Sequence, residues 1–154
     1  MLNPRIMTDQ STPPAGKPAH PSSQSKKRPP YRILVVDDDV SIRHLNTEVL
    51  IHFGYEVDEA ADGAAGLKAL KTKHYDLVIT DHLMPKVTGV EMIKMLRSQD
   101  TALPVIVTSG EISRAELKRQ PWLDISAVLL KPYSIVKLAK TVKAVLRTAA
   151  KLVE

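Results

Sequence analysis

The sequence predicts an α/β fold in which a doubly wound, five-stranded parallel sheet carries helices on both faces. Short strand-like runs alternate with segments of helical periodicity along the chain. Most of these runs are almost wholly aliphatic, as expected for strands buried on both faces. Polar residues follow directly after them, where open parallel sheets bind their ligands. The runs are residues 32–36, 55–59, 77–80, 104–108 and 127–130.

The first half of the chain contains three of these strands. After the first strand, apolar residues at helical spacing predict a helix that ends near Gly54. Tyr55–Glu59 alternates apolar with acidic residues, the pattern of an exposed edge strand. Asp62 is the expected N-cap of a second helix, with Leu67 and Leu70 inward. The predicted inward residues of the first helix are Ile42, Leu45, Val49, Leu50 and Phe53.

Capping boxes mark two helices in the second half. Thr88 and Glu91 predict a helix that continues to about Ser98. Ser113 and Glu116 predict another, ended by a proline. The last helix is expected from residue 134, with a basic stripe on its solvated face. Its predicted inward residues are Ile135, Leu138, Val142, Val145, Leu146 and Ala149.

Length and composition predict one domain, which we place at residues 31–150 of the 154. Apolar residues make up 44% of the chain, enough for a core. The absence of cysteine excludes disulfides and thiolate metal sites. No apolar run reaches the roughly 20 residues needed to cross a bilayer, so we expect no membrane insertion and a cytoplasmic location.

Residues 1–30 are expected to form a disordered tail. They hold seven of the eleven prolines and little apolar surface that could offset the entropy of ordering. Five basic residues and one acid give the tail a net charge of +4, whereas the remaining residues total +1. The high pI therefore describes the tail, and we expect no direct DNA binding by the folded part. The tail is either a passive leader or a docking arm.

Charged and polar side chains follow several strands. Asp37–Asp39, Asp81, Ser109 and Lys131 come after the first, third, fourth and fifth. In a parallel sheet these strand ends open onto one edge. The acids would repel one another unless a cation lay between them, and oxygen-only ligands favour Mg²⁺. A helix N-cap accounts for Asp39, but one cap needs only one acid.

A carboxylate beside Mg²⁺ can act as a nucleophile and form an aspartyl-phosphate. Asp81 is our candidate for this phosphoacceptor. Lys131 can place a positive charge on phosphoryl oxygens, and the Ser109 hydroxyl can donate to one of them. Taken singly, Lys131 also fits a surface lysine before a turn proline, and Ser109 a hydroxyl that bonds its own turn.

Four motifs resemble those of bacterial two-component response-regulator receiver domains, in that family's order and spacing. They are Ile33–Asp39, Asp76–Pro85 followed by Gly89, Pro104–Gly110 and Leu130–Tyr133. The similarity covers about residues 31–150. It implies a flavodoxin-like (βα)₅ fold with strand order 2-1-3-4-5.

The resemblance also implies roles for individual residues. A sensor histidine kinase or a histidine phosphotransfer protein would donate the phosphoryl group to Asp81. Mg²⁺ would be bound by Asp38, Asp81 and the Leu83 backbone carbonyl, with Asp37 acting largely through water. Lys131 would contact the phosphoryl group, and its bond to the following proline would be cis. Ser109 falls at the family's switch hydroxyl.

One position departs from the family. Val128 stands three residues before the lysine, where receivers usually carry a switching tyrosine or phenylalanine. The usual coupled rotation of hydroxyl and aromatic ring therefore cannot occur. This difference leaves the phosphorylation chemistry unchanged and bears on how the signal reaches the output face.

We therefore expect a single-domain, stand-alone response regulator whose phosphorylation changes its binding to an unknown output protein. It would not be an enzyme beyond its own phosphorylation and slow dephosphorylation. Alternatives are a relay intermediate that passes phosphate to a phosphotransfer histidine, and a pseudo-receiver adaptor that works without phosphate. The complete acid, hydroxyl and lysine set argues against the adaptor. A Mg²⁺-dependent phosphatase would need a substrate pocket and an acid/base group, and no cap insertion is visible.

Overall fold

The computed structural model describes residues 30–99, 101–110, 117 and 119–153. The expected tail, apart from residue 30, and most of the helix predicted to open at Ser113 lie outside these residues. The elements are β1 (Arg32–Val36), α2 (Val40–His52), β2 (Glu56–Ala60), α3 (Gly63–Thr72), β3 (Leu77–Asp81), α4 (Gly89–Ser98), β4 (Val105–Ser109), the 3₁₀ turn η1 (Pro121–Leu123), β5 (Ala127–Leu130) and α6 (Ile135–Val153).

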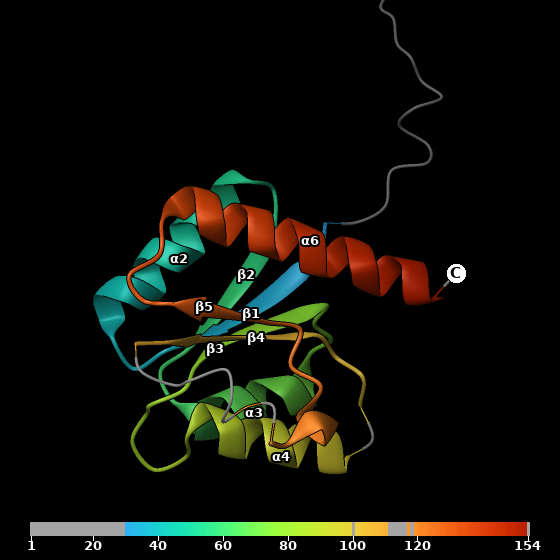
Figure 1. Ribbon diagram of the computed structural model, residues 1–154. Helices are drawn as coiled ribbons and strands as arrows, with labels where there is room; N and C mark the ends of the chain where they lie inside the picture. Colours follow the sequence, from blue (N-terminus) through green and yellow to red (C-terminus); the bar gives the residue numbers. More distant parts are fainter. Residues whose placement is uncertain (1–29, 100, 111–116, 118, 154) are drawn as a thin grey trace, which may run out of the picture.

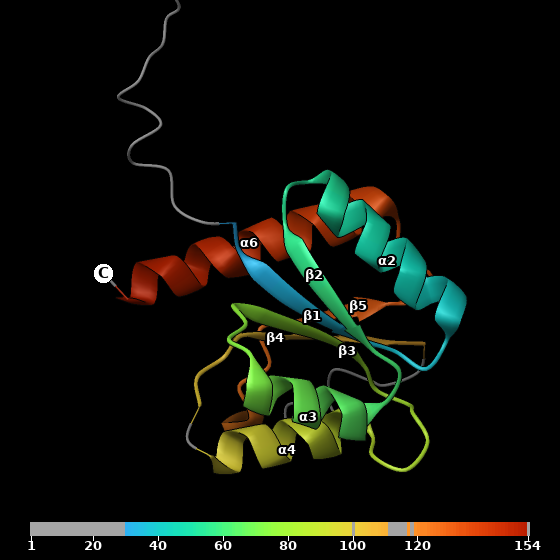
Figure 2. The ribbon, with the colours of Figure 1, turned by 180° about the vertical axis from the view of Figure 1, so that it is seen from behind.

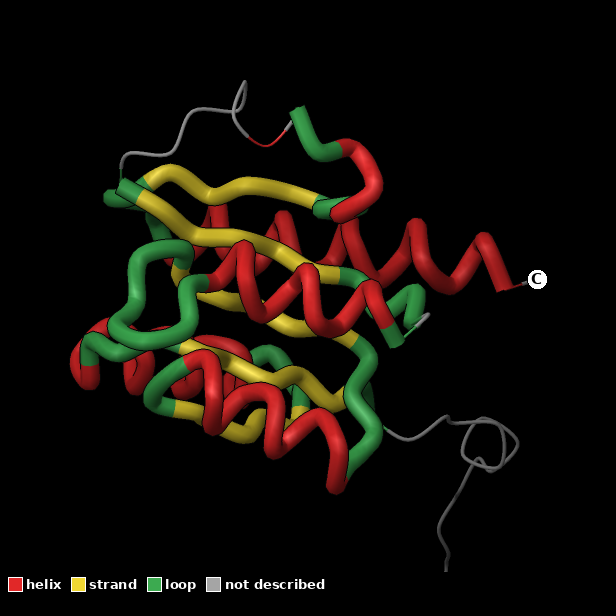
Figure 3. Tube along the Cα trace, turned by 90° about the horizontal axis from the view of Figure 1, so that it is seen from below, coloured by secondary structure: helices red, strands yellow, loops and turns green. Residues whose placement is uncertain are grey.

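The strands form one parallel sheet in the order β2-β1-β3-β4-β5. This is the flavodoxin-like order that the resemblance implied, and β2 lies at an edge as its alternating pattern predicted. Helices α2 and α6 cover one face, and α3 and α4 cover the other (Figures 1 and 2). Figure 3 shows the strands as a single layer between these helices. None of the described helices is long and apolar enough to span a bilayer.

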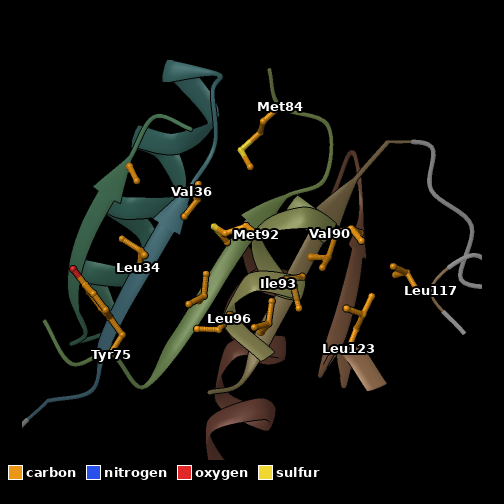
Figure 4. Packing of buried hydrophobic residues seen from close by; sticks show 14 residues of the cluster. Leu34, Val36, Tyr75, Met84, Val90, Met92, Ile93, Leu96, Leu117 and Leu123 are labelled. Atoms are coloured by element: carbon orange, nitrogen blue, oxygen red, sulfur yellow. The ribbon is translucent and has the colours of Figure 1, made fainter. Parts of the chain in front are cut away.

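Two aliphatic cores lie on opposite faces of the sheet. Alternate residues of β1 divide between them: Leu34 and Val36 face α3 and α4, whereas Ile33 and Val35 face α2 and α6. Figure 4 shows the first core, in which Met92 and Ile93 of α4 pack toward the sheet. Burying both faces of each central strand stabilises the sheet by roughly 25 cal/mol per Å² of apolar surface.

The central strands extend one residue further than predicted, to Asp81 in β3 and Ser109 in β4. Both side chains are consequently buried at the carboxyl ends of hydrogen-bonded strands. Their backbone is therefore held by the ladder instead of lying in a mobile loop.

The predicted inward face of α2 was partly wrong. Leu45 and Phe53 are 51% and 53% exposed, whereas Asn46 and Thr47 are buried. Asn46 Nδ2 donates a hydrogen bond of 2.9 Å to the Tyr133 hydroxyl, which satisfies a buried donor. An inward position of α2 is thus occupied by a polar residue with a buried partner, whereas the apolar Leu45 faces outward. The predicted inward residue Ile135 of α6 is also half exposed.

The helix caps match the sequence predictions. Asp39 accepts hydrogen bonds from two backbone N–H groups in the first turn of α2, and Asp62 accepts one in α3. Thr88 and Glu91 form a complete capping box at α4. These caps fix where α2 and α4 begin, and both helices begin next to the sheet edge that carries the acids.

Gly89 is the point at which α4 approaches the end of β3. Its N–H donates 2.8 Å to the His82 carbonyl. A methyl group on Gly89 would overlap the Asp81 carbonyl oxygen and crowd the backbone of His82. A glycine is therefore needed for this close approach.

We expect Gly89→Ala to lower the free energy of unfolding by about 2–4 kcal/mol, because no side-chain rotation relieves an overlap with backbone. Urea unfolding measures the change. The control is Gly110→Ala, near the end of the neighbouring strand, where an added methyl would meet no atom within 4 Å. Equal stabilities of the two variants would contradict the close approach.

Candidate functional site

Asp81 is the last residue of β3 and is only 7% exposed. The backbone on both sides of it is fixed. The Thr80 hydroxyl donates to the Asp81 carbonyl at 3.0 Å, and the His82 N–H donates to the Thr108 carbonyl at 2.9 Å. The carboxylate thus projects from a rigid strand end.

Three carboxylates gather at this edge, as predicted. Asp37, Asp38 and Asp81 each offer one oxygen, and these oxygens lie within 4.8 Å of one another. Asp37 is 2% exposed, whereas Asp38 faces solvent. Hard oxygen donors at this spacing suit a Mg²⁺ ion that keeps several waters. The donor set therefore fits the predicted metal.

Asp37 is oriented by its backbone neighbours. Its Oδ1 accepts the Asp39 N–H at 2.9 Å, and its own N–H donates to the Ala60 carbonyl. The Arg43 guanidinium donates to the Asp37 carbonyl at 2.8 Å and to Glu59 at the same distance. The acids thus divide their roles: Asp39 caps α2, and Asp37 turns inward.

Lys131 reaches the acids from the end of β5. Its Nζ lies 3.1 Å from Asp81 Oδ1 and 3.6 Å from Asp37 Oδ2. Its N–H donates to the Ser109 carbonyl at 2.9 Å, and its bond to Pro132 is cis, as the resemblance implied. A residue distant in sequence thus becomes the counter-charge of the acidic cluster.

Burial raises the pKa of the Asp37 carboxyl, and the charges of Asp81 and Asp38 act in the same direction. The Asp39 N–H and Lys131 lower this pKa without cancelling the rise. Burial by itself would lower the pKa of Lys131, but the hydrogen bond to Asp81 and the two carboxylate charges raise it on balance. Lys131 is therefore a fixed positive charge at neutral pH, whereas ionised Asp37 is costly.

Two buried hydroxyl residues end β4. Ser109, the predicted switch residue, is 1% exposed, and its contact with a phosphoryl group stays a prediction. Thr108 is paired in register with Asp81, and its hydroxyl lies 3.5 Å from Asp81 Oδ1. Thr108 was not predicted to take part in the site.

Leu83 and Val128 occupy their expected positions. Leu83 is exposed in the segment after β3, and the role of its carbonyl as a metal ligand stays a prediction. Val128 is half-buried in β5, paired with Val107, and packs against the core beneath α4. The position that is aromatic in most receivers is therefore filled by a small aliphatic side chain.

The ring of His82, the residue directly after Asp81, is not simply exposed to solvent. The residue is half-buried, and its Nδ1 atom is buried without a hydrogen-bond partner in the described part of the chain. Its backbone, by contrast, bonds both Thr108 and Gly89.

Sequence reasoning missed Arg43, Thr108 and the pair formed by Asn46 and Tyr133. Arg43 follows Asp39 by one helical turn, a spacing that favours contact with the preceding loop but does not specify it. Thr108 could have been found only from the strand register. Asn46 was a polar residue at an inward helical position, which is a signal for a buried partner.

A family model described as the response regulator receiver domain matches residues 33–143. The response regulator MprA of a Mycobacterium species is 37% identical over 120 residues, which cover 77% of this chain and 51% of that protein. The chain is also 35% identical over 103 residues to the sensor protein EvgS of Escherichia coli, covering 67% of this chain and 9% of that protein. The chain thus spans about half the length of the first of these relatives.

Solved structures agree with this match. The chemotaxis protein CheY4 of Vibrio cholerae superposes with a TM-score of 0.71 at 32% identity, covering 75% of this chain and 98% of that one. The response regulator TrrA of Thermotoga maritima, solved in complex with Mg²⁺-BeF, gives 0.67 at 33% identity, with the same coverages.

The raised pKa of Asp37 predicts a pH-dependent stability. Between the ordinary carboxyl value of 3.8 and the raised pKa, the folded protein binds more protons than the unfolded chain. The contribution of Asp37 to the free energy of unfolding therefore falls as pH rises through this window. Asp37→Asn should raise the unfolding free energy of the metal-free protein at neutral pH by on the order of 1 kcal/mol, with a smaller gain at about pH 4. Urea unfolding measures both values.

The control is Asp38→Asn, which removes a charge from the exposed member of the cluster. We expect it to leave the metal-free stability nearly unchanged, while both variants weaken Mg²⁺ binding measured by calorimetry. A metal-free Asp37→Asn protein that unfolds more easily than wild type at neutral pH would show that burial of ionised Asp37 carries no net cost.

Proposed function

The chain belongs to the response regulator receiver domain family, and from this premise we propose that Asp81 accepts a phosphoryl group from a phosphohistidine. The donor is a sensor histidine kinase or a histidine phosphotransfer protein. Phosphorylation changes how the domain binds a partner protein. The chain acts as a signalling module whose chemistry is confined to its own aspartate.

One observation carries this proposal. Lys131 Nζ lies 3.1 Å from Asp81 Oδ1, on a strand end where the carboxylates of Asp37 and Asp38 also gather. Phosphoryl transfer depends mainly on positioning and on neutralising charge. A buried carboxylate held between a cation and metal-binding acids meets both needs.

In the proposed step, a carboxylate oxygen of Asp81 forms a bond to phosphorus as the bond from phosphorus to the donor's imidazole nitrogen breaks. The electron pair of the broken bond stays on that nitrogen. Lys131 then neutralises phosphoryl oxygens, because its contact with Asp81 already places it beside the reacting group. Ser109 donates its hydroxyl to another phosphoryl oxygen.

Mg²⁺, when bound, supplies a Lewis acid that neutralises the phosphoryl oxygens. We assign its protein ligands to Asp38, Asp81 and the Leu83 carbonyl, with Asp37 acting through water. Two facts support this assignment: the oxygen-only donors within 4.8 Å, and the Mg²⁺-BeF in the related TrrA structure. The family resemblance specifies which atoms bind.

Exposed apolar side chains flank the site and suit a docking partner. Val40 directly follows the acids that come after β1, Leu83 follows Asp81 by two residues, and Ile135 and Val136 begin α6. Each is at least half exposed. Apolar groups around a polar centre favour contact with another protein over free solvent. We propose that the phosphodonor protein covers this rim during transfer.

The central test is labelling by a radioactive small acyl phosphate in the presence of Mg²⁺. We expect Asp81→Asn to reduce labelling by at least about 100-fold, since the amide is a poor nucleophile at a site that contributes several kcal/mol. The matched control is Asp124→Asn, at an exposed turn after η1, which should label as wild type does. If Asp81→Asn labels normally, Asp81 is not the acceptor.

A relay role is the second candidate. It is favoured by the similarity of the chain to a segment of the sensor protein EvgS, in addition to its similarity to response regulators. In a relay, Asp81 would return its phosphoryl group to a histidine on a phosphotransfer domain. The same site chemistry serves either role, because the transfer is reversible.

A phosphoryl-transfer chase experiment distinguishes a terminal regulator from a relay intermediate. Labelled protein, freed of its donor, is mixed with histidine phosphotransfer domains from the same cell. For a terminal regulator we expect the label to leave as inorganic phosphate, at an unchanged rate. Rapid appearance of label on a phosphotransfer histidine, blocked when that histidine is replaced, would instead establish a relay.

A further inference from the structure

Thr108 places a buried hydroxyl against the proposed phosphoacceptor. Its side chain is 1% exposed, and its strand register sets it directly beside Asp81. The hydroxyl lies 3.5 Å from Asp81 Oδ1, the same oxygen that Lys131 contacts at 3.1 Å. This separation is long for an O–H···O bond, so the contact is weak in the structure described.

Packing does not account for the hydroxyl. The preceding residues of β4, Val105–Val107, are aliphatic and fully buried. Valine would fill the volume of Thr108 without bringing a donor into the core. In the described part of the chain, the acceptor of this donor is Asp81 Oδ1. The hydroxyl is therefore placed for an effect on the carboxylate.

We propose that the Thr108 hydroxyl shortens the lifetime of the aspartyl-phosphate by stabilising the carboxylate that leaves when the phosphoryl group is hydrolysed. This inference rests on the proposed function, since it requires that Asp81 is phosphorylated. It concerns Thr108 and differs from the role assigned to Ser109, which donates to the phosphoryl group itself.

The reasoning follows the charge during hydrolysis. Because Lys131 and Thr108 both contact Oδ1, we assign Oδ2 as the oxygen that carries the phosphoryl group. In the phosphorylated state, Oδ1 is then a neutral carbonyl oxygen and a modest acceptor. Water forms a bond to phosphorus, the bond from phosphorus to Oδ2 breaks, and its electron pair returns to the carboxylate. Water's protons pass to the released phosphate and solvent.

The negative charge that returns is shared between both carboxylate oxygens. A hydrogen bond to a charged acceptor is stronger than one to a neutral acceptor. The Thr108 donor consequently stabilises the transition state for hydrolysis more than it stabilises the acyl phosphate. Removing the donor should leave the phosphorylated state longer-lived.

The test uses full-length protein labelled on Asp81 by a small acyl phosphate and then freed of the donor. Loss of label is followed in excess Mg²⁺ for wild type, Thr108→Val and Thr108→Ala. We expect both variants to lengthen the half-life by about three- to tenfold, the range for partial loss of a hydrogen bond to a developing charge. Two variants of different volume separate the hydroxyl from packing.

Thr108→Ser is the matched control because it restores the donor. We expect its half-life to lie within about twofold of wild type. A merely structural role would make Thr108→Ser and Thr108→Ala behave alike. The inference is overturned if the hydroxyl-free variants decay at the wild-type rate or faster, or if Thr108→Ser is as slow as they are.

Different results would contradict the phosphorylation of Asp81 and the role of the Thr108 hydroxyl. If wild type takes up no label, or if the label survives Asp81→Asn, the proposed function is wrong. If wild type is labelled on Asp81 but its lifetime is insensitive to the Thr108 hydroxyl, the phosphoacceptor assignment stands and only the role of Thr108 is lost.

Discussion

The site depends on the placement of three carboxylates and one ammonium at a single edge of the sheet. Asp37, Asp38 and Asp81 offer oxygens within 4.8 Å of one another, and Lys131 lies between two of them. Burying like charges this closely costs stability unless a cation accompanies them. The positive charge of Lys131 partly neutralises the carboxylates, and a bound divalent ion would neutralise them further. The site therefore carries an excess of negative charge, which favours the binding of Mg²⁺.

The strand order explains why this edge can hold the cluster. Because β1 lies beside β3, the acids after one strand meet the acid at the end of the other. Ser109 ends the next strand, β4, and the Ser109 carbonyl accepts the N–H of Lys131 from β5. The long lysine side chain then spans the distance back to β3. Gly89 allows α4 to pack closely against the end of β3. The backbone of Asp81 is therefore in contact with α4 as well as with the neighbouring strands.

The position at which receivers usually carry a switching aromatic ring is aliphatic in this chain. Val128 in β5 packs against the core on the face of the sheet that α4 covers. On the other face, Tyr133 follows Lys131 by two residues and is hydrogen-bonded to Asn46 in α2. That bond joins the segment carrying the lysine to a helix with exposed apolar residues such as Leu45. Described contacts thus connect the site to the surface around α2, in addition to the contact of Gly89 in α4 with the end of β3.

The sequence by itself determined the α/β class, the strand positions to within a residue and the caps of α2, α3 and α4, because these depend on local periodicity and short-range hydrogen bonds. Its motifs also brought Asp37, Asp38, Asp81, Ser109 and Lys131 forward as one set. Only the tertiary structure decided which face of α2 is buried, since Asn46 finds its partner 87 residues away. It alone set Thr108 beside Asp81 and Arg43 on the Asp37 carbonyl. Such contacts are decided by strand register and helix rotation, which follow from packing of the whole chain and leave no local signal.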